Sequence, residues 1–336
     1  MKEILEKIAC GQNLTRTEAR EALQLIIDDA ISATQAGALL MGLRQKGESV
    51  DEINGFLDVL TEHMVKVPLQ DDQAIDVCGT GGDGKGTFNI STTVAFVLAA
   101  AGVTVAKHGN RSISSKAGSA DLLEALGANI QLNAEQAKQC ADEIKITFFF
   151  APLYHPAMKN IAPHRKSLNM RTVFNMLGPL LNPAGVKRQL IGAFNAQAAE
   201  MMANVVLERG HDYAYVVHSS DGLDEVSPFS TTRVHEVKAK ERQLNHFEFN
   251  GFQTSGELNE ILGQSAEQNA EKLKLIFKGK KGADRDIVLL NSAFALKAAG
   301  KVNTIDQGIQ LAAEVIDSGA ALQKVKQFVE MSNSFN

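Results

Sequence analysis

Residues 74–101 read AIDVCGTGGDGKGTFNISTTVAFVLAAA, and this stretch decides the fold. Its first five residues have the short apolar character of a buried strand, and residues 91–101 have the longer apolar run of a buried helix. A loop with five glycines joins the two. A strand followed by a glycine-rich loop and a helix is typical of the first half of a β-α-β unit in a parallel sheet.

The same alternation continues toward the C-terminus. Further strands are predicted at 103–107, 146–151, 189–194 and 213–218, and helices at 120–126, 133–143 and 196–209. Residues 232–249 alternate as an antiparallel ribbon does, and the remainder is mostly helical in pattern. The pattern predicts an α/β fold with a mostly parallel central sheet.

The N-terminal 66 residues predict only helices. Three segments begin with a capping-box pattern, at 15–18, 32–35 and 49–52, and Gly47 ends the second of these helices. We therefore expect a small α-helical domain at 1–70 and a large α/β catalytic domain at 71–336. Residues 156–181 have helical pattern without a strand, so a segment at about 165–185 is expected to join the helical domain.

The overall charge excludes one class of protein. Lys and Arg number 34 and Asp and Glu 39, which gives a net charge of −5. Such a chain does not bind nucleic acid through its global charge, and the absence of Trp with only three Tyr disfavours base-stacking surfaces. The apolar run at 94–106 is too short to cross a bilayer, so no membrane partner is expected.

The cysteines point to a compartment. Cys10, Cys78 and Cys140 are too few and too scattered for a disulfide framework or a CxxC metal site. They indicate reduced thiols, and we expect a cytoplasmic enzyme.

The glycine loop has the features of a phosphate site, because glycines let backbone N–H groups approach an anion at the start of a helix. Two familiar patterns almost match and are rejected. Residues 79–84 fit GxGxxG, but no acid follows about twenty residues later to hold a ribose. Residues 79–85 fit GxxxxGK, but Gly86 stands where a P-loop has Ser or Thr.

Charge segregation strengthens the interpretation as an anion site. Residues 84–120 contain no Asp or Glu, whereas Lys85, Lys107, Arg111 and Lys116 carry positive charge. The loop 107–115, KHGNRSISS, presents ammonium, guanidinium, amide and hydroxyl donors. Because both loops follow strands of a parallel sheet, they are expected at the same edge, where ligands bind. The alternative is a solvated basic surface.

A second feature is the acidic sequence DGLDE at 221–225, which follows the strand predicted at 213–218. Adjacent carboxylates in a loop are usually only solvated. Beside a polyphosphate site, carboxylate oxygens are suitable ligands for Mg²⁺.

Several motifs together resemble the anthranilate phosphoribosyltransferase family. They are DVCGTGGDG from residue 76, TFNIST from 87, KHGNRSISS from 107, GSADLLEALG from 118, YHPAMK from 154, RTVFNMLGPLLNP from 171 and DGLDE from 221. The resemblance implies transfer of the phosphoribosyl group of phosphoribosyl diphosphate (PRPP) to anthranilate, with release of diphosphate, in tryptophan synthesis. It also implies a homodimer formed through the helical domain. Ser219 and Ser220 depart from the family pattern, in which a Gly often follows the preceding His.

The resemblance assigns roles residue by residue. It implies PRPP binding by Gly79, Gly82, Asp83, Thr87, Asn89, Ile90, Ser91, Thr92, Lys107, His108, Gly109, Asn110, Arg111, Ser112, Ile113, Ser114, Ser115 and Ser119. It implies Mg²⁺ binding by Ser91, Asp224 and Glu225, and anthranilate binding by Gly79, Asn110 and Arg165. A guanidinium such as that of Arg165 binds a carboxylate through two parallel hydrogen bonds.

No strong general base stands out, and the expected catalysis is positional and electrostatic. Lys107 and His108 are the candidates for direct participation. Two alternatives remain at this level: a pyrimidine nucleoside phosphorylase of the same fold, and a non-catalytic relative that binds nucleic acid. The second alternative predicts eroded motifs and a basic balance, whereas here the motifs are intact and the balance is acidic.

Overall fold

The computed structural model describes residues 1–112, 116–252, 254 and 256–335. The chain divides into two compact units. Unit 1 comprises Met1–Val65 and Pro152–Leu181, and unit 2 comprises Lys66–Ala151 and Asn182–Asn336. The segment that returns to unit 1 therefore begins at Pro152, earlier than the expected 165, and ends at Leu181. Backbone pairing explains the early start, because the Val65 N–H donates to the Tyr154 carbonyl at 2.9 Å.

Unit 1 is helical throughout its described residues. Its helices are α1 (Lys2–Ala9), α2 (Arg16–Ile27), α3 (Ala33–Lys46), α4 (Val50–Glu62), α9 (Met158–Leu168) and α10 (Phe174–Leu177), with the single turn α8 (Ala151–Tyr154) at its boundary and the 3-10 turn η1 (Gly178–Leu180). All three predicted capping boxes are confirmed, since Thr15, Ser32 and Ser49 each accept a bond from the backbone three residues on. Gly47 ends α3 with φ 86°, a conformation that favours glycine.

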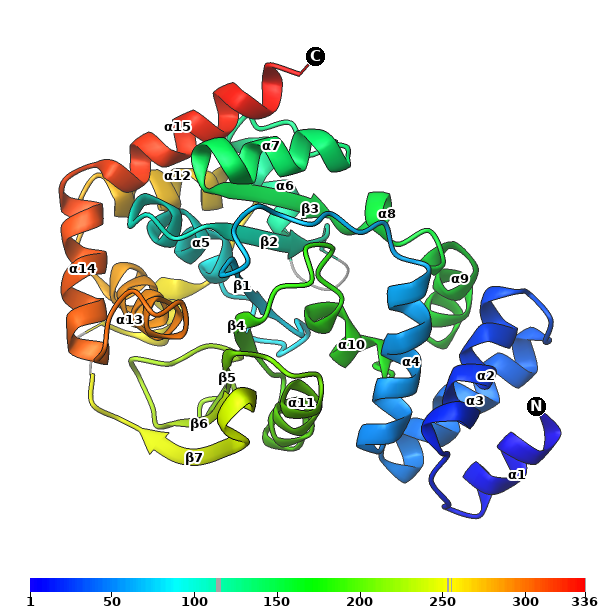
Figure 1. Ribbon diagram of the computed structural model, residues 1–336. Coiled ribbons are helices and arrows are strands. Elements are labelled where there is room, and N and C mark those ends of the chain that lie inside the picture. Colours follow the sequence, from blue (N-terminus) through cyan, green and yellow to red (C-terminus); the bar gives the residue numbers. More distant parts are fainter. Residues whose placement is uncertain (113–115, 253, 255, 336) are drawn as a thin grey trace. The chain divides into compact units, whose positions relative to one another are not determined.

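Unit 2 contains one seven-stranded sheet in the order β3-β2-β1-β4-β5-β6-β7 (Figure 1). Its strands are β1 (Ile75–Gly79), β2 (Val105–Gly109), β3 (Ile146–Phe150), β4 (Arg188–Gly192), β5 (Tyr213–Ser219), β6 (Thr232–Lys238) and β7 (Gln243–Phe249). The first five pair in parallel, and β6 and β7 form the antiparallel ribbon predicted at 232–249. The predicted fold, a small helical domain with a mostly parallel α/β domain, is confirmed.

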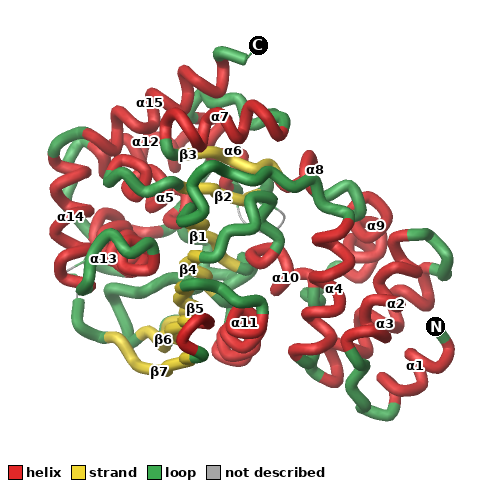
Figure 2. Tube along the Cα trace, in the orientation of Figure 1, coloured by secondary structure: helices red, strands yellow, loops and turns green. Residues whose placement is uncertain are grey.

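Helices make up most of the remainder of unit 2. They are α5 (Ile90–Ala100), α6 (Ser119–Ala125), α7 (Ala134–Ile144), α11 (Ala196–Glu208), α12 (Ala266–Phe277), α13 (Ala283–Ala298), α14 (Ile305–Asp317) and α15 (Ala320–Asn333), with the 3-10 turns η2 (Ala239–Glu241) and η3 (Leu258–Ile261). Figure 2 shows how these helices surround the sheet. None of the helices in the described residues has both the length and the apolar character needed to cross a membrane.

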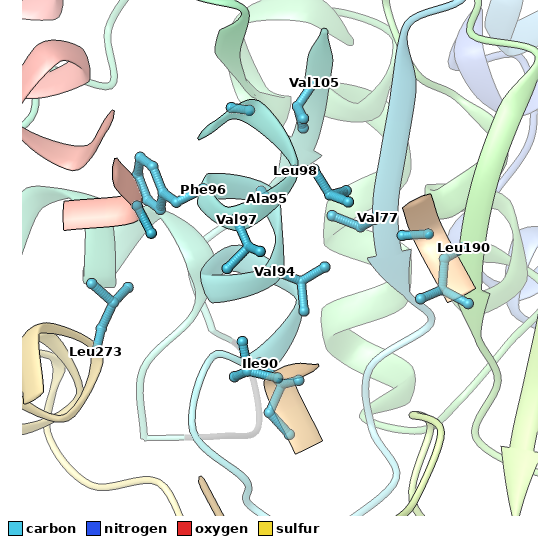
Figure 3. Packing of buried hydrophobic residues seen from close by; sticks show 14 of the residues in the cluster. Val77, Ile90, Val94, Ala95, Phe96, Val97, Leu98, Val105, Leu190 and Leu273 are labelled. Atoms are coloured by element: carbon cyan, nitrogen blue, oxygen red, sulfur yellow. The ribbon is translucent and has the colours of Figure 1, made fainter. Parts of the chain in front are cut away.

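The core of unit 2 lies between the sheet and α5. Alternate strand residues, among them Ile75 and Val77, join the apolar cluster that also contains α5 and α13. In Figure 3, Leu98 of α5 lies against Val77, whereas Phe96 points to the opposite side of the helix. Because α5 is buried on nearly all sides, its first turn is held rigidly at the end of β1.

One strand begins later than predicted. We expected a strand at 103–107, but β2 covers Val105–Gly109. Val103 belongs to the turn that ends α5, because its N–H donates to the Leu98 carbonyl at 3.1 Å. The shift places Lys107 in the middle of β2 and leaves Asn110 as the first loop residue.

Candidate active site

The glycine loop runs from the end of β1 to the first turn of α5. Gly81, Gly82, Gly84 and Gly86 have φ values between 63° and 76°, in the left-handed region that other residues rarely adopt. The GxGxxG-like spacing therefore follows from the path of this loop. The path returns the chain to Asn89, which precedes α5 and makes no side-chain cap to it. The N–H groups of the first turn of α5 thus lack a side-chain cap and are suited to an anion.

The acidic loop after β5 packs closely against the ends of β1 and β4. A Cβ atom at Gly79 would lie 2.7 Å from Oδ2 of Asp224, and one at Gly192 would lie 1.6 Å from the Asp224 carbonyl oxygen. Only glycine at these two positions permits that approach. The packing brings the predicted metal ligands Asp224 and Glu225 to the same edge of the sheet as the glycine loop.

Three carboxyl groups then face one another with little compensation. Burial, and next the charge of Asp83, raise the pKa of Asp224 to about 7. Burial and the Asp224 charge raise the pKa of Glu225 well above its ordinary value, against the opposing effect of Lys107. Asp83 accepts from the Lys85 N–H through Oδ1 at 3.1 Å, but its buried Oδ2 has no hydrogen-bond partner among the described residues. Acidic side chains are thus crowded together in this region, and their ionised forms repel one another.

A divalent cation fits this cluster. Carboxylate oxygens are the preferred ligands of Mg²⁺, and a cation would offset the repulsion between Asp83 and Asp224. The described residues contain no group of three or more His, Cys, Asp or Glu side chains that forms a ready metal site. Mg²⁺ typically takes one or two carboxylates and completes its shell with water and substrate phosphates. Ser91 lies in the first turn of α5, where its hydroxyl was predicted to join the metal site.

Lys107 provides the nearby positive charge. Its side chain is only 4% exposed, and Nζ donates to the Val77 carbonyl at 2.7 Å. The next residue, His108, is also buried, and its backbone N–H donates to Oδ1 of Asp76 at 3.3 Å. The end of β2 is thus tied to β1 through both a side chain and the backbone.

The second loop, residues 110–118, has its own compensating acids. Arg111 pairs with Asp121 at 3.1 Å and with Oε1 of Glu124 at 2.7 Å. Both acids lie just beyond the acid-free window 84–120, so the free positive charge inferred for Arg111 from that window is balanced in the structure. Asp121 also accepts from the N–H groups of Gly118 and Ser112 at 2.8 and 3.2 Å.

The two ends of this second loop lie in close contact with each other. A Cβ atom at Gly118 would lie 2.4 Å from the Ser112 nitrogen, so the base of the loop closes only with glycine. Ser119 Oγ donates to the Asn110 carbonyl at 3.2 Å. Ile113, Ser114 and Ser115, which were predicted to bind PRPP, lie outside the described residues.

The predicted site residues fall into two groups. All of those described except Arg165 belong to unit 2, at the carboxyl ends of β1, β2 and β5. Arg165 lies on α9 of unit 1. Its guanidinium carbon is 5.3 Å from the ring centroid of Phe174, and burial lowers its pKa. Within the described residues Arg165 has no carboxylate partner, unlike an ordinary surface arginine.

Sequence reasoning missed the buried support of the site. Asp76 is fully buried in β1, and Asn182 Nδ2 donates to its Oδ2 at 2.8 Å and to the Ala106 carbonyl at 2.7 Å. Burial raises the pKa of Asp76, opposed by Lys107 and by these hydrogen bonds. An acid within an otherwise apolar strand was the available signal for Asp76. Nothing in the sequence linked Asn182 to it.

Family models match both domains of this chain. The family model described as "Glycosyl transferase family, a/b domain" matches residues 71–322, and the model of the helical bundle domain of the same family matches residues 2–64. The first match alone covers most of unit 2. Both domains of this chain therefore have the organisation of glycosyl transferases of this family.

More specific relatives share the whole length. The chain is 48% identical over 336 residues to the anthranilate phosphoribosyltransferase of Acetivibrio thermocellus, covering 100% of this chain and 97% of that protein. It is 45% identical to the enzyme of Rhodopseudomonas palustris, with 98% of each chain covered. The chain belongs to the anthranilate phosphoribosyltransferase family, as its motifs indicated.

Solved structures agree with this assignment. The crystal structure of anthranilate phosphoribosyltransferase from Thermus thermophilus matches with a TM-score of 0.91 and 36% identity, covering 98% of this chain and 99% of that one. The enzyme from Saccharomyces cerevisiae in complex with PRPP and Mg matches with a TM-score of 0.87 and 27% identity, covering 99% and 97%. These relatives favour the anthranilate phosphoribosyltransferase family over the two alternatives, a nucleoside phosphorylase and a nucleic-acid-binding relative.

Proposed function

We propose that this chain transfers the phosphoribosyl group of PRPP to the amine of anthranilate, giving N-(5-phosphoribosyl)anthranilate and diphosphate in tryptophan biosynthesis. Membership of the family supports this activity. The structural observation that carries it is the juxtaposition of Asp83, Asp224 and Glu225 with the glycine loop and Lys107. An uncapped helix start, a buried ammonium and unbalanced carboxylates within one sheet edge suit a diphosphate bound with a divalent cation.

The phosphate side of the site is assigned to unit 2. Residues of the glycine loop and of the first turn of α5, from Gly79 to Thr92, bind the diphosphate through backbone N–H groups. Those of Thr80, Phe88 and Ile90 take no part, because they already donate within the chain. Lys107 contributes positive charge, and residues His108 to Ser119, which include the second loop, bind the rest of PRPP. Ser91, Asp224 and Glu225 hold Mg²⁺, which supplies charge neutralisation of the leaving diphosphate when bound. The relative from Saccharomyces cerevisiae that was solved with PRPP and Mg supports this assignment.

Anthranilate is assigned to Gly79, Asn110 and Arg165. The guanidinium of Arg165 is the group suited to its carboxylate, since Arg165 has no acidic partner among the described residues. A structure of the Saccharomyces cerevisiae enzyme in complex with 4-fluoroanthranilate supports binding of this class of acceptor in the family.

The chemistry needs positioning more than a base. The bond between the ribosyl carbon and the diphosphate oxygen breaks, the bond from that carbon to the anthranilate nitrogen forms, and the nitrogen then loses a proton. Negative charge grows on the diphosphate, where Lys107 and backbone N–H groups stabilise it. Aniline-type nitrogen attacks as the neutral amine, so no group must deprotonate it beforehand. His108 is retained as the candidate that accepts the proton afterwards.

Unit 1 is proposed to form a homodimer interface with a second copy of the chain. Large apolar side chains of unit 1 are exposed, among them Met41, Leu153 and Met170, at 38–41% of their surface. The family resemblance implies a dimer formed through this helical domain, which supports the proposal. A cytoplasmic location is likewise proposed, on the basis of three cysteines that form no disulfide bond with one another.

The test of the proposed function uses the fluorescence of anthranilate. The fluorescence is expected to disappear only when enzyme, PRPP and Mg²⁺ are all present. Loss of signal without PRPP, or no loss with all components, would contradict the proposal. The variant Arg165→Ala tests the acceptor assignment, because it is expected to raise the anthranilate KM about tenfold while the PRPP KM changes less than about twofold.

A further inference from the structure

A segment far along the chain runs beside the glycine loop. The Phe88 N–H donates to the Ile261 carbonyl at 3.0 Å, and the Gly263 N–H donates to the Gly86 carbonyl at 2.7 Å. These bonds form an isolated antiparallel bridge between Thr87 and Leu262. The segment from Ile261 to Asn269 therefore lies against the second half of the loop, which leads into α5.

Close contact fixes this pairing. A Cβ atom at Gly263 would lie 2.6 Å from the Thr87 carbonyl oxygen, so another side chain there would push the two segments apart. Phe88 and Ile261 are both buried, with 2% and 0% exposure. Lys272 of α12 lies with Nζ 5.3 Å from the centroid of the Phe88 ring. The end of the glycine loop is thus held from outside by the region around α12.

The side-chain amide of Asn269 connects α12 to a residue of the predicted site. Asn269, on the first turn of α12, is 2% exposed. Its Nδ2 donates to Oδ1 of Asn89 at 3.0 Å, while its Oδ1 accepts from the Gln264 N–H at 2.9 Å. These two bonds use both ends of the Asn269 amide and define its orientation.

Asn89 is in turn hydrogen-bonded to the second loop. Its Nδ2 donates to the Ala117 carbonyl at 3.0 Å, and its backbone carbonyl accepts from both the N–H and the hydroxyl of Thr93. With Oδ1 bound to Asn269 and Nδ2 to Ala117, the Asn89 side chain spans from α12 to the second loop. It is therefore unable to cap α5. The Ile90 N–H donates to the Phe88 carbonyl at 2.7 Å, and the N–H groups of Ser91 and Thr92 remain for a ligand.

We infer that Asn269 is a positioning residue for PRPP binding, acting through Asn89 to set the spacing between the start of α5 and the Ala117–Ser119 segment. The inference rests on the proposed function. Among the described residues, Asn89 is the predicted ligand-binding residue to which Asn269 is hydrogen-bonded. Loss of its side chain removes one buried hydrogen bond from Asn89 and leaves the Asn89 amide free to turn toward the helix start, where it competes with phosphate.

The experiment compares Asn269→Leu with Gln268→Leu as the matched control. Gln268 is exposed on the same helix, and its side-chain Oε1 accepts from the Ser265 N–H at 3.2 Å in the capping box of α12. We expect Asn269→Leu to raise the PRPP KM about tenfold and the anthranilate KM less than about twofold. Gln268→Leu is expected to change neither KM by more than about twofold. A folded Asn269→Leu enzyme with an unchanged PRPP KM, or with equal increases in both constants, overturns the inference.

A double variant makes the test specific for the connection through Asn89. If Asn269 acts through Asn89, then Asn89→Leu with Asn269→Leu has the same PRPP KM as Asn89→Leu alone. Multiplying effects would show that Asn269 acts by another route and would overturn the inference. Asn269→Ser, whose hydroxyl is too short to reach Asn89, replaces Asn269→Leu if that variant does not fold. Failure of the proposed function is distinguishable, because the unsubstituted chain would then show no PRPP-dependent loss of fluorescence.

Discussion

The two loops that follow β1 and β2 differ in how their charges are balanced. At the glycine loop, Asp83, Asp224 and Glu225 lie together, and the pKa of Asp224 rises to about 7 because of burial and the Asp83 charge. At the second loop, burial of Asp121 is outweighed by the Gly118 and Ser112 N–H groups and by Arg111, so its pKa is lowered. The acidic groups at the glycine loop need a bound cation to balance their charge, whereas the charge of Arg111 in the second loop is already balanced by Asp121 and Glu124.

The largest expected effect comes from removing the unbalanced charge. Asp224→Asn with Glu225→Gln is expected to lower kcat by about 10²-fold or more, since loss of a metal anchor removes at least ~2.7 kcal/mol of transition-state stabilisation. Steady-state rates at saturating PRPP over a Mg²⁺ titration measure this. Glu267→Gln with Glu271→Gln on the outer face of α12 is the control and should retain normal rates. Near-normal turnover of the first variant at limiting Mg²⁺ would contradict the comparison.

The next effect contrasts the two cations of the region. Lys107 is buried and opposes the carboxylates near the glycine loop, so Lys107→Gln is expected to lower kcat/KM for PRPP about 30-fold. Arg111 is exposed and already paired with Asp121 and Glu124, so Arg111→Gln should lower it less than about threefold. Both values come from initial rates at saturating anthranilate. A greater loss for Arg111→Gln would show that the second loop is not charge-balanced in the working enzyme.

A smaller effect is expected from loosening the second loop. Asp121→Asn removes the charge that holds two backbone N–H groups and Arg111, and we expect the PRPP KM to rise about fivefold. Glu124→Gln is the matched control, because Glu124 binds Arg111 but, unlike Asp121, is not bonded to the N–H groups of Ser112 and Gly118. Its PRPP KM should change less than about twofold. Equal effects of the two substitutions would mean that the Arg111 pair, and not the backbone contacts of Asp121, organises the loop.

His211, which is buried away from both loops, allows the effect of a buried titratable group on stability to be compared with the effects expected at the loops. Burial, and next the charge of Lys187, lower the pKa of His211 to about 3. The folded state then binds fewer protons than the unfolded state below about pH 6.5, so stability is lost as the pH falls. We expect the free energy of unfolding to fall by up to about 1.4 kcal/mol per pH unit between about pH 6 and 4 from this residue.

Denaturant unfolding at several pH values measures this dependence, and His211→Asn is expected to reduce the slope. Oε1 of Gln189 accepts a hydrogen bond from Nε2 of His211 at 2.9 Å, whereas Nδ1 has no partner among the described residues. An identical slope in the variant would assign the acid sensitivity to other groups.

Local features of the fold were predictable because they depend on neighbouring residues. Asn133, at the start of the helix predicted at 133–143, caps α7, since its side chain accepts from the Gln136 N–H. The antiparallel ribbon follows from its alternating pattern. The strand order was not predictable, because residues such as Ile75 pair with both Val105 and Arg188, and no local property selects these partners.

The candidate site shows the same division. The motifs indicated Lys107, Asp224 and the glycine loop, because their residue types carry the chemistry. Asn269 was missed because it lies 180 residues from Asn89 and its amide has no distinctive neighbours in the sequence. The balance of Arg111 was missed for a simpler reason: the acid-free window ended one residue before Asp121.

The two edge strands of the sheet differ in how readily they could pair with a strand of another chain and so start aggregation. All five residues of β3 are buried, so that edge offers no strand to a foreign chain. β7 is the accessible edge, and it carries Gln243, Asn245 and Glu248 among its exposed residues. Polar and charged side chains on an edge strand discourage the pairing that starts aggregation. Replacing them with β-branched apolar residues would remove a safeguard against misassembly without touching either loop of the active site.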